Sequence, residues 1–183
     1  MDGTSKNMAS AFGHAAAAWA LSKVHPKKIM TRKILVLGII SSIIPDIDVL
    51  CFKFGISDDH ILGHRGITHS LVFGLVWAII LITLFHRKES HKYLICCYYA
   101  IATISHGLLD ALTNGGAGVA FFYPFTDERY FLPWRVIQVS PLGAADFFSE
   151  WGIQVLLNEA MFIGAMSFLV YVIGMWLNKK VYR

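Results

Sequence analysis

Charged residues are scarce in this sequence, and their scarcity excludes an ordinary soluble domain. Lysine, arginine, aspartate and glutamate make up 15% of the 183 residues, whereas hydrophobic residues make up 56%. Soluble domains carry about 25% charged residues. The mean hydropathy is +0.56, so the composition predicts a protein whose main solvent is a lipid bilayer.

Cysteine is also scarce, and low-complexity sequence is missing. The chain has three cysteines, Cys51, Cys96 and Cys97, and this odd number does not indicate a disulfide framework. Because no repeat or long polar linker divides the chain, the sequence predicts one domain over residues 1–183. Residues 113–152 are rich in glycine, proline and aromatics, which indicates a folded cap rather than a linker.

Long apolar runs dominate the rest of the chain. Residues 34–50, 71–85, 93–112 and 153–177 each approach the roughly 20 residues with which a helix crosses a hydrocarbon core. A fifth, shorter run covers residues 8–24. The expected fold is therefore all-α: a polytopic membrane bundle of about five segments with an irregular cap on its outer side.

The positive charges are concentrated in short loops between these runs. The net charge is +4, and eleven of the sixteen basic residues form three clusters. If the segments cross alternately, all three clusters lie on one side, which the positive-inside rule places in the cytoplasm. No nucleic-acid surface is expected. The clusters are Lys23, Lys27, Lys28, Arg32 and Lys33; Arg87, Lys88 and Lys92; Lys179, Lys180 and Arg183.

Histidines and aspartates from four segments reach the opposite, outer face in this topology. Ionisable groups at membrane depth are costly, by about 2.5–3.5 kcal/mol for a central Asp on insertion scales, so converging ones usually pair or bind an ion. The predicted metal ligands are His14, Asp46, Asp48, His64, His69, His106 and Asp110.

The spacing within these segments supports a metal site. His106 and Asp110 are four positions apart, which places an imidazole and a carboxylate on one helical face. Pro45 is expected to weaken the helix that carries Asp46 and Asp48. One of these two acids would then bind metal while the other activates water.

The string from Gly63 to Ser70, Gly-His-Arg-Gly-Ile-Thr-His-Ser, precedes the third apolar run. Its glycines predict irregular structure, and Thr68 is the expected N-cap of the following helix. His69 would then enter on the first turn. Arg65 suits a clamp for an oxyanion or phosphate.

Each of these residues also has a structural interpretation. His14 alone is as easily a hydrogen-bonded core residue, Asp46 and Asp48 fit an interfacial helix end, and His106 with Asp110 fits a buried pair. Convergence of all seven favours the metal site. Four other histidines fall in predicted loops and are expected on solvated surface: His25, His60, His86 and His91.

Several charged residues near the same face have weaker assignments. Arg129 and Arg135 either hold a lipid phosphate or lie plainly at the surface. Asp146 and Glu150 are reserve ligands, four positions apart. Glu159 lies within the last apolar run, where it needs a partner or water, and it receives no role.

Four histidines and three carboxylates exceed the needs of one tetrahedral zinc, which favours one or two zinc ions, or another divalent metal, with some residues in supporting positions. Such centres activate water for hydrolysis. We expect attack on an ester or phosphoester of a lipid or lipid-linked substrate, with Asp48, Arg65 and Thr68 in catalytic roles. The alternative is a protein that binds or transports a divalent cation without catalysis.

These motifs resemble the bacterial family of membrane-bound metal-dependent hydrolases, which includes damage-inducible inner-membrane proteins. The resemblance covers about residues 12–141 and rests on Gly13-His14, Pro45-Asp46-Ile47-Asp48, the string from Gly63 to Ser70, and His106-x-x-x-Asp110. It implies an integral inner-membrane protein with a metal centre, and the charge pattern places that centre on the periplasmic side.

A more distant similarity is to the zinc-dependent phospholipases C. Those all-helical enzymes also use an early His, an Asp, a middle His and a His-x-x-x-Asp pair in that order. Their later His and His-x-x-x-Glu ligands have no clear counterpart here, so a complete three-zinc site is not expected.

Overall fold

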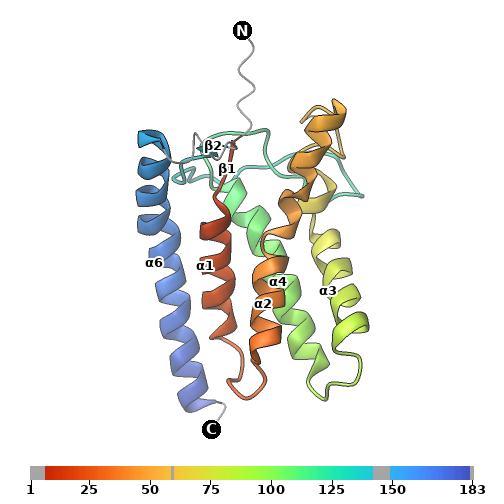
Figure 1. The fold of residues 1–183 in the computed structure, drawn as a ribbon, viewed down its shortest axis with the longest axis vertical. Coiled ribbons are helices and arrows are strands. Elements are labelled where there is room, and N and C mark those ends of the chain that lie inside the picture. Colours follow the sequence, from red (N-terminus) through yellow and green to blue (C-terminus); the bar gives the residue numbers. More distant parts are fainter. Residues whose placement is uncertain (1–6, 59, 142–148, 182–183) are drawn as a thin grey trace.

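In the described part of the chain, five α-helices lie side by side and run between two ends of the bundle (Figure 1). The computed structural model describes residues 7–58, 60–141 and 149–181. The all-α prediction is confirmed, because β structure in these ranges is limited to two isolated bridges and a pairing of β1 (Asn7–Met8) with β2 (Ser140–Pro141). The helices are α1 (Ala11–Ser22), α2 (Arg32–Ser41), α3 (Leu71–Phe85), α4 (Lys92–Ala111) and α6 (Glu150–Lys180).

Three helical stretches are long and apolar enough to cross a membrane: Arg32–Phe54, Lys92–Ala111 and Glu150–Lys180. α3 is apolar but has 15 residues. α1 has 12 residues, which extend about 18 Å at 1.5 Å per residue. The five apolar runs are thus all helical, but they differ in length, and α6 extends three residues beyond its predicted run at each end.

The second segment changes from α-helix to 3-10 helix near Pro45, where the sequence predicted a weakened helix. α2 ends at Ser41, and the chain continues as the 3-10 helix η1 (Ile44–Phe54) with Pro45 in its first turn. Proline has no N–H to donate to the preceding turn, which accounts for the break. Gly55 ends η1 with a φ of 74°, a conformation that glycine adopts without steric cost.

The third membrane segment begins differently from the prediction. A short 3-10 turn, η2 (Ile67–His69), leads into α3, and the Ser70 hydroxyl caps α3 by accepting the Phe73 N–H at 3.1 Å. The expectation that Thr68 is the N-cap is therefore wrong. The Thr68 hydroxyl instead donates to an Asp48 carboxylate oxygen at 2.5 Å.

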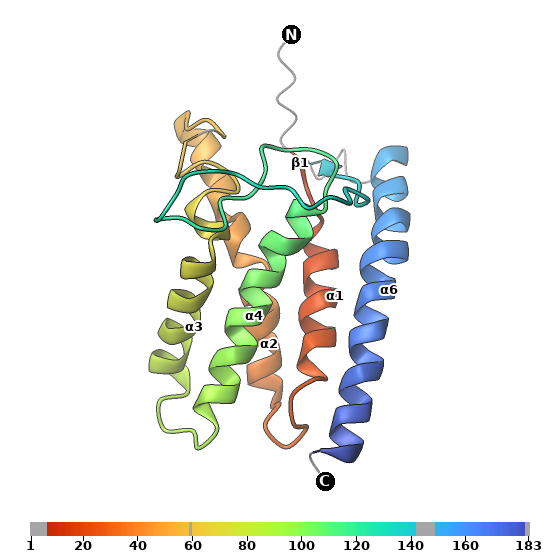
Figure 2. The same cartoon turned by 180° about the vertical axis from the view of Figure 1, so that it is seen from behind.

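An irregular cap of residues 113–140 covers one end of the bundle, while the α1–α2 and α3–α4 connections lie at the other end (Figure 2). Arg129 holds the cap to the loop before η2, because its guanidinium donates to the carbonyls of Asp58, His60 and His64. The three basic clusters therefore gather at the end away from the cap, with Arg183 outside the described residues.

α4 forms the centre of the bundle. Its Tyr98 and Tyr99 are fully buried, and the Tyr98 hydroxyl donates to the Ala18 carbonyl of α1 at 3.1 Å. The expectation that His86 is solvated is wrong. His86 is buried, and its Nε2 lies 2.9 Å from the Tyr99 hydroxyl.

Candidate metal centre

The seven predicted ligands meet beneath the cap. α1 contributes His14, η1 contributes Asp46 and Asp48, the loop and η2 contribute His64 and His69, and α4 contributes His106 and Asp110. All except Asp46 are buried. The prediction that four separate segments bring these side chains together at one end is confirmed.

One group of four has the geometry of a coordination site. Ligand atoms of Asp46, His69, His106 and Asp110 all lie within 4.8 Å of one another. His106 Nε2 lies 3.1 Å from Asp46 Oδ1, and His69 Nε2 lies 3.4 Å from Asp110 Oδ2. Ligands about 2.0–2.1 Å from a tetrahedral zinc are separated by about 3.3 Å, so these spacings fit a small divalent cation.

The backbone sets the orientation of His106. Its Nδ1 lies 2.7 Å from the carbonyl oxygen of Ser42. A carbonyl only accepts hydrogen bonds, so this contact requires the proton on Nδ1 and leaves the Nε2 lone pair of a neutral ring directed at the group of four. Metal-binding histidines are commonly held in this way.

Asp48 contacts two further histidines through their Nδ1 atoms. Its Oδ1 lies 2.8 Å from His64 Nδ1, and its Oδ2 lies 3.2 Å from His69 Nδ1. Oδ2 also accepts the Thr68 hydroxyl and the Arg65 backbone N–H. With both Nδ1 atoms donating to one carboxylate, the Nε2 atoms of His64 and His69 are left as acceptors whenever the rings are neutral.

Several buried ring nitrogens have no hydrogen-bond partner among the described residues. Among the predicted ligands they are both nitrogens of His14 and the Nε2 atoms of His64 and His69; outside the cluster, His86 Nδ1 is another. Buried polar atoms are rarely left unsatisfied unless an ion or water completes them. No protein donor competes for these ligand nitrogens, so the residues fit a metal.

His14 lies beside the group of four rather than within it. Its ring stacks on that of His106, and its Nε2 is 3.7 Å from Asp110 Oδ1. The same Asp110 oxygen accepts the Ala9 backbone N–H at 3.3 Å. His14 therefore contacts two members of the group of four, His106 and Asp110.

Arg65 does not occupy the position expected of a substrate clamp. It is fully buried; Nε lies 3.1 Å from Asp110 Oδ2, while Nη1 and Nη2 donate to the Gly115 carbonyl and the Thr113 hydroxyl. A Cβ on Gly116 would lie 2.4 Å from Nη1, so only glycine fits there. The guanidinium holds Asp110 from inside the protein.

The charges of the cluster favour a cation. Three carboxylates and the Arg65 guanidinium leave two net negative charges when the imidazoles are neutral. Burial lowers the pKa of His69, but the adjacent carboxylates of Asp110 and Asp48 outweigh that effect and raise the pKa to about 9. A proton on His69 partly balances the carboxylates, and a divalent cation that replaced this proton would balance them fully.

The remaining polar candidates lie outside the cluster. Glu150 is exposed on the first turn of α6, and Asp146 lies outside the described residues. Glu159 is buried and accepts the Ser10 backbone N–H at 2.5 Å and the Ser10 hydroxyl. It therefore joins α6 to the start of α1. Arg135 is exposed and donates to the Thr113 carbonyl.

Sequence reasoning missed the supporting residues Thr113 and Ser10. Thr113 holds Arg65, and Ser10 receives Glu159. The Thr-Asn-Gly-Gly stretch that begins at Thr113 was a usable signal, because two adjacent glycines directly after a ligand-bearing helix permit close approach of another side chain. Ser10 offered only its position before a helix.

Comparisons with known proteins agree with a membrane bundle. Residues 3–181 match the model of the family described as YdjM inner membrane protein. The inner membrane protein YbcI of Escherichia coli (strain K12) is 36% identical over 171 residues, which cover 92% of this chain and 98% of that protein. No solved structure matches the chain significantly. The chain therefore belongs to the YdjM family of inner membrane proteins.

Proposed function

We propose that this protein is a metal-dependent hydrolase of the inner membrane that cleaves an ester or phosphoester in a lipid or lipid-linked substrate. The observation that carries the proposal is the group formed by Asp46, His69, His106 and Asp110, whose ligand atoms are spaced for one small cation. Mixed imidazole and carboxylate centres of this kind serve hydrolysis in many enzymes.

His69, His106 and Asp110 of the group of four would hold one zinc ion, the metal that this ligand mixture suits, and would leave a fourth position open beside Asp46. When bound, zinc lowers the pKa of a coordinated water toward about 7 and polarises a substrate oxygen. Asp48, His64 and His69 form a second group of possible ligands. A second ion there would displace hydrogen bonds that Asp48 makes, so we propose one firmly held ion.

The chain's own groups would have separate tasks. Asp48 keeps His64 and His69 in the tautomer that presents Nε2, which is a positioning role rather than the general-base role first expected. Arg65 holds Asp110. Asp46 is the least buried carboxylate of the cluster, with 11% of its side chain exposed. If the other three members of the group hold the ion, Asp46 would be free to accept a proton from the attacking water.

A groove beside Asp46 supports a lipid substrate. This groove has a volume of about 320 Å³ and is lined by Asp46 and by Ile40, Ile43, Ile44 and Ile47. These residues belong to the membrane-spanning stretch Arg32–Phe54. An acyl or isoprenoid chain lying against the isoleucines would bring its polar head to Asp46 directly from the bilayer.

Metal analysis and a hydrolysis screen together test the proposal. Protein purified in detergent should contain close to one zinc per chain, and chelation should abolish its hydrolysis of lipid esters or phosphoesters until zinc is restored. Asp110→Asn should lose both metal and activity, whereas Asp127→Asn in the exposed cap should lose neither. A metal-free protein that stays folded and hydrolyses lipid at an unchanged rate would refute the proposal.

Cation binding without catalysis is the alternative, and it uses the same ligands. Transport would need a polar path through the other half of the bundle. The core described there is built from Ile34, Leu81 and Ile95 together with the buried rings of Tyr98 and Tyr99, which disfavours such a path. Zinc content without turnover of any lipid substrate in the screen would favour binding alone.

A further inference from the structure

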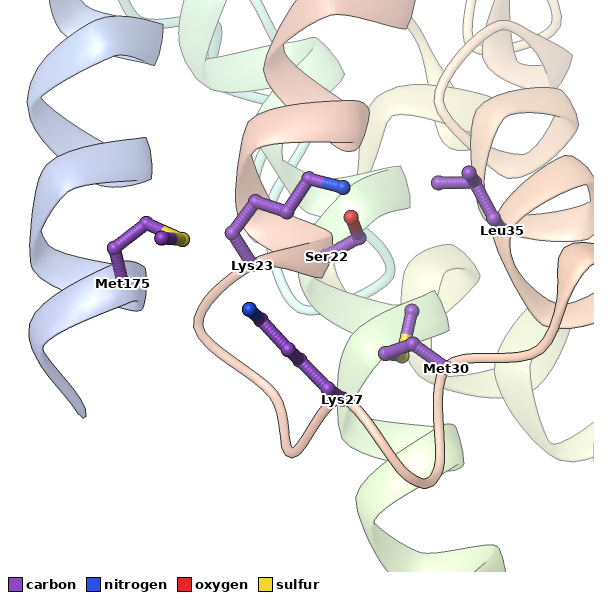
Figure 3. Close-up of a pocket in the computed structure, with 6 residues that line it drawn as sticks. All are labelled: Ser22, Lys23, Lys27, Met30, Leu35 and Met175. Carbon is purple, nitrogen blue, oxygen red and sulfur yellow. The ribbon is translucent and has the colours of Figure 1, made fainter. Parts of the chain in front are cut away.

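A second cavity lies at the basic end of the bundle, away from the metal centre. Its volume is about 170 Å³, and Figure 3 shows its lining residues. α1 ends beside it, α2 begins beside it, and the last turns of α6 close one side. The lining residues are Ser22, Lys23, Lys27, Met30, Leu35 and Met175.

α6 fixes the shape of this cavity. The Asn178 side chain donates to the carbonyls of Lys23 and His25 at 2.8 and 3.1 Å and accepts the Lys27 backbone N–H at 2.9 Å. A Cβ on Gly174 would lie 2.4 Å from the Lys23 carbonyl oxygen. The loop is therefore held tightly against α6, and both lysines extend from a defined backbone.

Two ammonium groups share the cavity without an acidic partner. Lys23 and Lys27 both line it (Figure 3), and neither forms an ion pair with a carboxylate in the described part of the chain. Among the described residues, Glu89 in the α3–α4 connection is the acidic residue at the basic end of the bundle. An anion in the cavity would give both ammonium groups an opposite charge to pair with.

The apolar walls of the cavity favour a lipid head group over a free anion. Met30, Leu35 and Met175 offer apolar surface beside the ammonium groups. Trp19 and Trp176 lie next to Lys23 and Lys180, whose Nζ atoms sit 4.6 and 5.2 Å from the respective ring centroids. Tryptophan is enriched at the head-group level of a bilayer.

We propose that this cavity binds the phosphate head group of an anionic phospholipid from the adjacent leaflet. The phosphate would lie between Lys23 and Lys27, and the first carbons of the lipid would contact the two methionines and Leu35. Basic pockets between membrane helices bind anionic lipids by this combination of charge and apolar contact. The proposal does not depend on the chemistry of the metal centre.

Native mass spectrometry of delipidated protein tests this site, with phosphatidylglycerol and phosphatidylcholine titrated separately. Wild type should retain one phosphatidylglycerol at concentrations where phosphatidylcholine does not bind. Lys23→Gln with Lys27→Gln should weaken that binding at least tenfold. Lys28→Gln with Lys179→Gln removes the same charge from exposed positions outside the cavity and should leave binding within twofold.

Two further measurements keep the result decisive. Met175→Trp retains both lysines but fills the cavity, so it should also release the lipid; this variant decides the case if the lysine pair fails to fold. Equal losses in both lysine pairs would mean that a diffuse basic surface attracts the lipid and would overturn the site. Displacement of phosphatidylglycerol by equimolar inorganic phosphate would overturn the lipid assignment.

Discussion

The imidazole rings of His14 and His106 stack face to face, with centroids 3.7 Å apart and planes inclined by 16°. Two imidazolium rings at this distance would repel strongly in a buried site. The contact therefore disfavours a charge on both rings at once, and a neutral imidazole is the form in which histidine binds a metal. Stacking thus couples α1 to the ligand group through His106.

His106 and His14 should differ in their effect on metal content. His106→Ala removes a member of the group of four and should abolish zinc retention after dialysis. His14→Ala removes only the stacked neighbour and should weaken zinc affinity about 10–100-fold, the effect of losing an outer partner. His60→Ala, at an exposed position, is the control. Elemental analysis and zinc titration measure both effects, and equal losses at His14 and His60 would contradict this assignment.

Asp48→Asn should reduce zinc affinity about 10–100-fold without a large change in volume. The amide can no longer accept from His64 and His69 through both oxygens, so their Nε2 lone pairs are less well presented. Competition with a fluorescent zinc chelator gives the affinity. If Asp48 were instead an essential base with no positioning role, the variant would bind zinc normally and lose only turnover.

Arg65→Ala should destabilise the fold and strip the metal. It removes the buried partner of Asp110, and breaking a buried ion pair costs about 3–5 kcal/mol. Arg65→Lys should recover little, because one ammonium cannot reach Asp110, Thr113 and Gly115 together. Thermal unfolding in detergent and zinc content measure this, with the exposed Arg87→Ala as control. Normal zinc content with lost hydrolysis would restore a substrate-clamp role.

Ile47→Trp should obstruct the groove that leads to Asp46. The side chain is 53% exposed, so the substitution should fold and keep its zinc. We expect turnover of a long-chain lipid ester to fall at least tenfold, with a smaller effect on a short-chain, water-soluble ester. Ile79→Trp on α3, at 58% exposure, should change neither rate. Equal loss for both esters would place the substrate elsewhere.

Cysteine labelling in intact cells should establish the orientation. Lys28→Cys and Lys88→Cys lie in the connections at the basic end, and Asp58→Cys and Glu128→Cys lie at the capped end. In a background with the three native cysteines replaced by serine, we expect an impermeant maleimide to label the second pair and not the first. The reverse pattern would place the metal centre in the cytoplasm.

Helix positions and ligand convergence could be predicted from the sequence because they follow from local patterns. The apolar run at residues 71–85 coincides with α3, and Pro45 ends regular α-helix through its missing N–H. Convergence followed from the alternating crossings, which bring His14, Asp46 and His106 to one face in either orientation; the charge rule predicts only which side that face lies on.

The partners of the charged side chains could not be predicted, because they depend on distant parts of the chain. The sequence does not reveal that Arg65 meets Thr113 and Asp110 rather than open space, or that Glu159 reaches Ser10. His86 shows the same limit, since a loop position gives no sign of the Tyr99 hydroxyl that buries it. The cap was misassigned to Thr68 for the same reason, since the sequence gives no sign that the Thr68 hydroxyl bonds to Asp48, 20 positions away.

Every residue of the metal centre lies between His14 and Asp110, whereas α6 begins at Glu150. During synthesis, the centre and most of its cap can therefore assemble before the last helix enters the membrane, since segments that emerge earlier fold first. Insertion of α6 then completes the protein, as Glu159 bonds to Ser10 and joins the last helix to the first. The chain order thus allows the candidate metal centre to form before the bundle closes.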